Sequence, residues 1–251
     1  MSLRHPQILA LARREGRVTV EDLSERFGVS LQTVRRDLGE LAEAGRLQRV
    51  HGGAVLSSGT TNLAHADRRA MAAEAKAAIG RAAAARIPEG ASLFLGIGTT
   101  TEAVAEALTG HGRLLVVTNN LNVAEILSDG PAEIVVTGGR LRSSDGGLTG
   151  AMAAEGVARF RPDWAVFGCS ALDPDGTMLD FDAEEASVTQ AAIRAARRTM
   201  LVADGGKFAR TAPLRLGPLR DVDVFVTDQA LTSSGLTRAC ENWNVEVRVA
   251  S

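Results

Sequence analysis

The chain has 251 residues, of which 45% are hydrophobic and 23% charged, and its formal net charge is −2. These ordinary values allow one large or two smaller folded domains and exclude a polycation whose whole surface binds nucleic acid. Positive charge must be local, and the first 56 residues, with nine arginines against seven acidic residues, carry a formal +2 that leaves −4 for the remainder.

The cysteines, histidines and hydropathy narrow the location and the chemistry. Cys169 and Cys240 are too few for a disulfide framework or a metal cluster, which favours a reducing compartment. Arg13 and Arg14 interrupt the first apolar run, and no later run reaches membrane-spanning length. The four histidines lack the spacing of metal ligands. We expect a cytoplasmic protein with no membrane partner, no metal and no cofactor.

The first fifty-six residues have the pattern of a winged helix–turn–helix. A short helix is predicted over Pro6–Arg14. Thr19 is suited to cap a second helix, with Asp22 as its capping-box partner. A turn at Gly28 follows, and Ser30 is suited to cap a third helix.

The third helix and the segment after it predict a surface that binds DNA. Val34, Leu38 and Leu41 recur at helical spacing and predict a buried stripe, while the opposite face is polar and basic, suited to base edges and phosphates. Strands over Arg46–Val50 and Ala54–Leu56 predict a wing. The alternative is an amphipathic helix pair with a solvated basic face, but caps, turn, spacing and wing agree and favour DNA. The candidate DNA contacts are Ser30, Gln32, Thr33, Arg35, Arg36, Arg49 and His51.

A second domain of different pattern follows a polar stretch, SSGTTN. We expect domains over 1–56 and 67–251, joined by a linker over 57–66. After a helix over Asp67–Ile87, short apolar strands alternate with helices, which predicts an α/β fold with a largely parallel, Rossmann-like sheet covered on both faces. The segments GGRLRSSDGG and DGGKFAR are predicted as loops. The predicted strands are Ser92–Leu95, Leu114–Thr118, Glu133–Thr137, Trp164–Gly168, Thr199–Ala203, Asp223–Thr227 and Val245–Val249, and the predicted helices are Thr100–Leu108, Leu121–Ser128, Ala151–Phe160, Ala183–Arg198 and Gly235–Asn242.

Glycine-rich or polar turns follow several of these strands, at the edge where parallel sheets bind ligands. The turn Gly96–Thr101 leads into a helix, whose N-terminus favours a phosphate or carboxylate, and Arg140 and Lys207 could add positive charge. Nucleotide binding is weaker, because the turn has no Walker lysine and Thr101 replaces the third glycine of a Rossmann fingerprint. A purely structural tight turn is the alternative, but several such turns on one edge favour a pocket.

Acidic residues suggest an enzyme as a further alternative. Most of them suit turns or helix N-termini, and Ser170 has no G-x-S-x-G context. No base and nucleophile pair stands out, so no catalytic residue is assigned. The acidic candidates are Asp173, Asp175, Asp180, Asp182, Glu184, Glu185 and Asp204, with Lys207 as an electrostatic partner.

Nearly the whole chain resembles the DeoR-type family of bacterial transcriptional regulators. The motifs VRRDLGEL and RVHGGA resemble the family's winged helix–turn–helix, and Gly98–Thr101, Thr118–Asn120, Gly138–Arg140 and the Asp204-to-Lys207 segment resemble its sugar-phosphate-sensing domain. That domain is similar in fold to ribose-5-phosphate isomerase and CoA transferases. The resemblance implies a regulator, usually a repressor, of carbohydrate uptake or catabolism genes. It also implies a phosphorylated sugar or related metabolite as inducer, and a dimer or higher oligomer.

The resemblance also implies which residues bind the effector. The threonine turn would hold the phosphate. Gly96 and Ile97 stand where the family often has an acidic residue and a serine, and Gly205 and Gly206 where it often has two serines, which affects contacts to sugar hydroxyls. The candidates are Gly98, Thr99, Thr100, Thr101, Thr118, Asn119, Asn120, Gly139, Arg140, Asp173, Asp204 and Lys207.

Three hypotheses follow. The leading one is a ligand-responsive repressor that binds double-stranded operator DNA at the nucleoid. The second is a sugar-phosphate isomerase-like or CoA-transferase-like enzyme with an appended DNA-binding domain, which turnover of a sugar phosphate would reveal. The third is a constitutive DNA-binding protein with a vestigial pocket, which would not be stabilised by any sugar phosphate.

Overall fold

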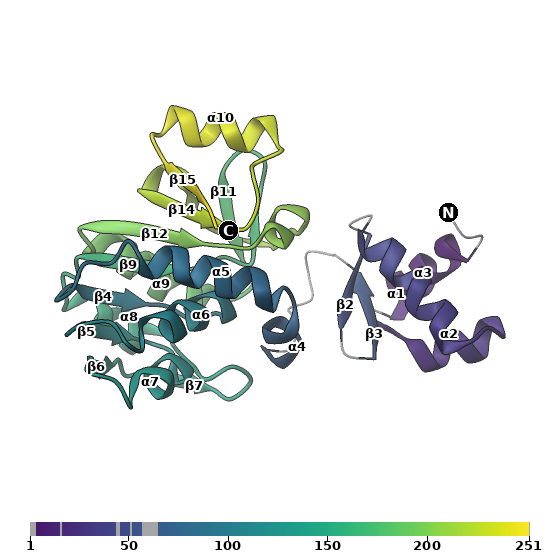
Figure 1. Cartoon of the computed structure of the whole chain (residues 1–251), viewed down its shortest axis with the longest axis horizontal. Coiled ribbons are helices and arrows are strands. Elements are labelled where there is room, and N and C mark those ends of the chain that lie inside the picture. Colours follow the sequence, from purple (N-terminus) through teal and green to yellow (C-terminus); the bar gives the residue numbers. More distant parts are fainter. Residues whose placement is uncertain (1–3, 16, 44–45, 51, 57–64, 251) are drawn as a thin grey trace. The chain divides into compact units, whose positions relative to one another are not determined.

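The computed structural model describes residues 4–250 except 16, 44–45, 51 and 57–64 (Figure 1). The chain divides into two compact units, Met1–Met71 and Ala72–Ser251, here called the N-terminal and C-terminal units. Each unit has its own hydrophobic core. In the described part of the chain, no helix has the length and apolar character needed to cross a bilayer.

The N-terminal unit combines three packed helices with a three-stranded antiparallel sheet of order β1-β3-β2. The predicted helix–turn–helix and wing are confirmed. The sequence does not predict β1, because a three-residue strand is defined only by its pairing with β3, where Arg17 lies opposite Val55. The elements are α1 (His5–Glu15), β1 (Arg17–Thr19), α2 (Val20–Phe27), α3 (Leu31–Glu43), β2 (Leu47–Val50), β3 (Gly53–Leu56) and, after the wing, α4 (His65–Ala70).

The caps of the helix pair form as the sequence predicts. Thr19 Oγ1 accepts a hydrogen bond from the Asp22 N–H at 3.1 Å, and Ser30 Oγ accepts one from the Thr33 N–H at 3.2 Å. Gly28 ends α2 with φ +61°, a left-handed conformation that glycine adopts without strain. The two helices therefore pack at a defined turn, over a core that contains Ile8, Leu23, Val34, Leu38 and Leu41.

The single helix predicted over Asp67–Ile87 is wrong. The chain instead forms α4, which ends at Ala70, and α5 (Ala73–Ala84). Ala72, between them, has φ +51°. A left-handed conformation costs an L-residue about 1–2 kcal/mol, and nothing in an alanine-rich sequence announces it, so the break could not be predicted locally.

The C-terminal unit is built on a seven-stranded sheet of order β15-β14-β12-β9-β4-β5-β6 (Figure 1). Every pairing in it is parallel, which confirms the predicted fold class. Alternate residues face opposite cores: Leu93 and Val116 pack with α5, α6 and α7, whereas Phe94 and Val117 pack with α8, α9 and α10. The elements are β4 (Ser92–Leu95), α6 (Thr99–Leu108), β5 (Leu115–Thr118), α7 (Leu121–Leu127), β6 (Glu133–Val136), α8 (Ala151–Ala158), β9 (Trp164–Phe167), α9 (Ala183–Ala195), β12 (Arg198–Val202), β14 (Val224–Thr227), α10 (Ser234–Asn242) and β15 (Glu246–Val249).

Two smaller sheets contain strands that are not predicted from the sequence. The segment GGRLRSSDGG, predicted as a loop, includes β7 (Arg140–Arg142) and leads into β8 (Gly147–Thr149), and the two strands form an antiparallel hairpin. A second sheet of order β10-β11-β13 joins β10 (Ala171–Leu172), β11 (Thr177–Asp180) and β13 (Leu214–Pro218). The segment DGGKFAR folds into the 3₁₀ helix η1 (Gly205–Ala209), and η2 (Leu219–Asp221) follows β13. Such short strands carry little periodicity, so their pairing is set by tertiary contacts.

Candidate DNA and effector sites

The outward face of α3 presents polar and basic side chains. Gln32, Arg35 and Arg36 are exposed, whereas Val34 and Leu38 on the same helix are buried. The Arg36 side chain is 72% exposed, and its Nε lies 3.8 Å from Glu40 Oε1 one turn later. An exposed pair of this kind is weak, so Arg36 can exchange it for a phosphate or a base edge.

The remaining DNA candidates divide between the cap and the wing. Ser30 Oγ lies 2.9 Å from Thr33 Oγ1, so both hydroxyls take part in capping α3. Arg49 is exposed on β2. His51, a candidate DNA contact between the two predicted wing strands, lies outside the described residues. The neighbouring Gly52 accepts a hydrogen bond from the Val20 N–H at 2.8 Å, which ties the wing turn to the start of α2.

The strand order locates the ligand-binding edge of the C-terminal unit. From β4 the chain moves outward through β5 to β6, then returns to β9 on the other side of β4 and continues through β12 to β14 and β15. Ligands of open parallel sheets bind beyond the carboxyl ends of the strands at such a reversal. The predicted turns follow β4, β5, β6 and β12, and Gly168–Ser170 follow β9 at the reversal itself.

The turn after β4 is shaped to receive an anion. Gly98 precedes the first residue of α6 with φ +140°, a conformation that favours glycine. Thr99 and Thr100 form the first turn of α6, where backbone N–H groups point out of the helix and the dipole is positive. Thr99 is half-buried and Thr100 is buried.

Two of the predicted threonines already use their hydroxyls inside the protein. Thr101 Oγ1 donates to the carbonyls of Gly96 at 2.8 Å and Gly98 at 2.6 Å. Thr118 Oγ1 donates to the Leu95 carbonyl at 2.7 Å and accepts the Asn120 N–H at 3.0 Å. These side chains shape the turns after β4 and β5, and their hydroxyl hydrogens are not available to a ligand.

The two asparagines after β5 differ in whether the side-chain oxygen is already used inside the protein. Asn120 Oδ1 caps α7 by accepting the Asn122 N–H at 3.0 Å. Asn119 donates through Nδ2 to the Leu148 carbonyl on β8 at 3.0 Å. Its Oδ1 is buried and has no hydrogen-bond partner in the described structure. A buried acceptor without a partner is an unusual and costly arrangement, which makes Asn119 Oδ1 a candidate ligand contact.

The positively charged candidates occupy different surroundings. Arg140 begins β7, its side chain is 74% exposed, and it pairs with Glu184 at 2.5 Å. Lys207 lies in η1, which Asp204 caps by accepting the Gly206 N–H at 3.0 Å.

Close packing and turn position limit the other two candidates. At Gly139 (φ +135°) a Cβ atom would lie 2.8 Å from the Thr149 carbonyl, so β8 approaches the backbone closely there. Asp173 is not brought to these residues by any contact described: it lies in the turn between β10 and β11, where Gly176 packs against α10.

Arg142 is the centre of an ionic cluster that the sequence does not reveal. It pairs with Asp145 at 2.7 Å on its own hairpin, and with Asp182 at 2.8 Å and Glu185 at 2.5 Å at the start of α9. Burial, and then the charge of Asp180, raise the pKa of Glu185 to about 7 against the pull of Arg142. Asp182 also caps α9, as its position predicts. The pairing across 40 residues has no local signal.

The edge does not present an activated nucleophile among its cysteines. Cys169 follows β9 and is buried, and this burial raises the pKa of its thiol to about 12. The thiol is therefore fully protonated at neutral pH and unsuited to covalent catalysis.

Comparison with known proteins identifies both units. Residues 4–60 match the DeoR-like helix-turn-helix domain, and residues 71–229 match the DeoR C terminal sensor domain. The chain is 45% identical over 226 residues to the glycerol-3-phosphate regulon repressor of Escherichia coli strain K12, covering 90% of each protein. It is 39% identical to the HTH-type transcriptional repressor CsqR of the same strain, over 97% of this chain and 94% of the relative. It is 33% identical to the transcriptional repressor AccR of Agrobacterium fabrum, over 90% and 88%.

Solved structures give more distant likenesses. Ribose 5-phosphate isomerase A from Methanocaldococcus jannaschii shares 11% identity over 55% of each chain, with a TM-score of 0.40. The delta subunit of eIF2B from Chaetomium thermophilum shares 17% identity over 65% of this chain and 59% of that one, with a TM-score of 0.48. Neither likeness carries an argument about function.

The curated relatives named above are transcriptional repressors, not enzymes, and they match almost the whole chain. The chain therefore belongs to the DeoR family: it is a DNA-binding transcriptional repressor with an N-terminal helix–turn–helix domain and a C-terminal sensor domain.

Proposed function

We propose that this repressor controls genes for the uptake or catabolism of a phosphorylated three-carbon polyol, and that glycerol 3-phosphate or a close analogue releases it from its operator. The observation that carries the effector assignment is the 45% identity, over 90% of both proteins, to a repressor named for the glycerol-3-phosphate regulon. A small effector also agrees with the glycines at 205 and 206, which contribute no side-chain hydroxyls. The protein would act in the cytoplasm, at the nucleoid when bound to DNA.

A DNA-binding domain over residues 1–56, within the N-terminal unit and followed by a linker over 57–66, would read the operator. We assign base and phosphate contacts to Gln32, Arg35 and Arg36, because these side chains are exposed on the helix face opposite the core. Arg49 and His51 would contact the backbone from the wing. Ser30 and Thr33 would act through the cap that fixes the start of α3.

The effector domain, expected over residues 67–251, would hold the effector at the edge of the parallel sheet. The phosphate would lie against the first turn of α6, at Gly98, Thr99 and Thr100, where N–H groups and the helix dipole favour an anion. Asn119 Oδ1 would accept a hydrogen bond from a polyol hydroxyl, because it is buried without a partner in the described structure. Lys207 and Arg140 would supply the countercharge. Thr101, Thr118, Asn120, Gly139 and Asp204 would shape the site rather than bind, and Asp173 would lie outside it.

We further propose that the repressor is a dimer or higher oligomer, because a single reading helix carries little positive charge and half-sites are read in pairs. Effector binding would favour a subunit arrangement in which the paired reading helices no longer match the half-site spacing. It can do so only through different affinities for the two arrangements. Sedimentation with and without effector would report both the oligomer and its change.

The decisive experiment combines ligand binding with operator release. The melting temperature of the full chain is measured in the presence of glycerol 3-phosphate, fructose 6-phosphate, glycerol or inorganic phosphate. In a second measurement, the fluorescence anisotropy of a labelled operator, selected from random duplexes, reports whether each compound releases the DNA. A true effector stabilises the fold by about 2.7 kcal/mol at a hundred times its Kd, and it releases the DNA.

Two matched variants localise the site. Lys207→Met should lose the stabilisation, whereas Arg220→Met, which removes an exposed charge on η2, should keep it. Stabilisation by a hexose phosphate alone would replace the proposed effector. Stabilisation by no phosphate ester would support a constitutive DNA-binding protein.

A further inference from the structure

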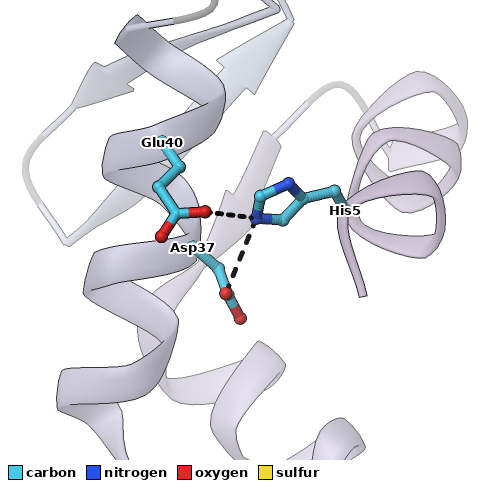
Figure 2. Close-up of side chains that lie close together, drawn as sticks. All are labelled: His5, Asp37 and Glu40. Atoms are coloured by element: carbon cyan, nitrogen blue, oxygen red, sulfur yellow. Dashed lines mark ion pairs between the residues drawn. The ribbon is translucent and has the colours of Figure 1, made fainter. Parts of the chain in front are cut away.

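Three potential metal ligands meet between α1 and the DNA-reading helix α3 (Figure 2). His5 is the first residue of α1, and Asp37 and Glu40 lie three residues apart on α3, so both face the same way. His5 Nε2 lies 3.6 Å from Asp37 Oδ1 and 3.5 Å from Glu40 Oε2. The three atoms lie within 4.8 Å of one another.

The Nε2 atom of His5 has no hydrogen-bond partner in the described structure. A separation of 3.5–3.6 Å is too long for a hydrogen bond from a ring nitrogen to a carboxylate. His5 is only 4% exposed, and its Nε2 is buried without a hydrogen-bond partner. Asp37 is 1% exposed. A buried nitrogen thus points between two carboxylate oxygens without bonding to either.

We propose that a divalent transition-metal ion, of which Zn²⁺ is the best match, binds between His5 Nε2, Asp37 Oδ1 and Glu40 Oε2. Ligand atoms about 2.1 Å from a tetrahedral ion lie about 3.4 Å from one another, close to the two distances from His5 Nε2 to the carboxylate oxygens. One imidazole and two carboxylates suit zinc, with water as the fourth ligand.

The second oxygen of each carboxylate is turned toward an arginine, as in the outer shell of many metal sites. Arg4 Nε donates to Asp37 Oδ2 at 2.7 Å, and Arg36 Nε lies 3.8 Å from Glu40 Oε1. Arg4 Nη2 also donates a longer hydrogen bond, of 3.3 Å, to Asp37 Oδ1, which a carboxylate oxygen can accept while it ligates a metal. The ion would link the first turn of α1 to the middle of α3, and so hold the helix that carries Arg35 and Arg36 against the core. The ligands come from distant parts of the sequence, which is why histidine spacing does not reveal them.

The test uses the full chain, stripped of metal with EDTA and desalted. Zinc chloride is added, free zinc is removed by gel filtration, and zinc per chain is measured by elemental analysis. We expect one retained zinc and a higher melting temperature. Cobalt in place of zinc should give the intense visible absorption of a four-coordinate site. A chain that retains no zinc, and whose melting temperature is unchanged by it, would overturn the proposal.

Variants decide whether the bound zinc lies at these residues. His5→Gln and Glu40→Gln should each weaken zinc binding by more than the roughly 10–100-fold typical of losing an outer-shell partner. His111→Gln removes a histidine from the C-terminal unit and should leave zinc retention unchanged. If His5→Gln does not fold, Glu40→Gln still decides, because that side chain is 47% exposed. Full zinc retention in Glu40→Gln would overturn the proposal.

Discussion

The two units of this repressor differ in whether their candidate functional residues are also part of the packed interior. In the N-terminal unit, α3 buries Val34 and Leu38 on one face and exposes Arg35 and Arg36 on the other. In the C-terminal unit, the candidate residues are themselves part of the packing: Thr101 and Thr118 are fully buried, and their hydroxyls bond to neighbouring carbonyls. The polar candidates are exposed in the N-terminal unit, as a binding role requires, whereas these polar candidates of the C-terminal unit are buried.

The difference has a physical origin. A reading helix must project its contacts into a groove, so its functional side chains cannot also fill the core. A ligand site at a sheet edge is made from the loops that close the strands, and polar side chains there must first satisfy buried backbone groups. A polar motif is therefore a direct sign of function on α3 and an ambiguous one at the sheet edge.

The largest expected effect is on operator binding. Replacing both Arg35 and Arg36 by alanine should lower operator affinity at least about 100-fold, since each base-edge contact is worth about 1–3 kcal/mol and each lost phosphate contact reduces the salt slope by about 0.9. Fluorescence anisotropy at several salt concentrations measures both quantities. Arg161→Ala, an exposed charge in the C-terminal unit, is the control. Unchanged affinity with a flat salt dependence would remove α3 from the interface.

The next effect is on stability at the threonine turn. Thr101→Val should destabilise the fold by about 1–3 kcal/mol, because it removes a buried donor and leaves two carbonyls, of Gly96 and Gly98, without it. Thr99→Val, on the same helix turn and half-buried, should cost less than about 1 kcal/mol and instead weaken effector binding. Urea unfolding and ligand titration separate the two. Equal destabilisation by both variants would contradict the division of roles.

A smaller effect concerns the ionic cluster at α9. The pKa of Glu185 is raised to about 7 from an ordinary 4.5, so the folded carboxyl binds more proton than the unfolded one between these values. Its stabilising contribution is thus complete below about pH 4.5 and is lost as the pH rises through about 7. The melting temperature of the native chain should fall more between mildly acidic and mildly basic pH than that of Glu185→Gln. Parallel melting curves would show that the group titrates normally.

The smallest effect should come from Arg140→Ala. The Arg140 and Glu184 side chains are 74% and 45% exposed, and such surface pairs contribute about 0–1 kcal/mol. Stability should therefore barely change, while glycerol 3-phosphate affinity falls if the guanidinium also serves as countercharge. Isothermal titration at low and moderate salt would measure this. A clear loss of stability with full ligand affinity would make Arg140 a purely structural residue.

The sequence predicts those elements that are decided locally. Thr19, Gly28 and Ser30 mark the helix pair through their own caps, and the apolar strands of the parallel sheet are recognisable because they are buried on both faces. It does not predict the β7–β8 hairpin, the break at Ala72 or the Arg142 cluster, because each depends on a partner distant in sequence or on backbone strain. The exposed polar face of α3 could thus be predicted from its residues. For the effector candidates, the sequence predicts only that they lie at the same edge of the parallel sheet, not which of them are free to bind.

The position of β4 also governs how the chain can fold. It is the first strand of the sheet to be made, yet it lies between β5 and β9, and Leu93 pairs with Val116 on one side and with Trp164 on the other. The hydrogen bond of 2.9 Å from the Ser92 N–H to Asp163 Oδ2 can form only after residue 163 has been synthesised. During synthesis the N-terminal unit can bury its apolar residues early, while the Leu93–Leu95 segment stays exposed until β9 emerges. Such late, long-range pairing is slow and leaves apolar strands open to aggregation. The C-terminal unit, rather than the N-terminal unit, is therefore the part of this repressor that needs protection from aggregation during synthesis.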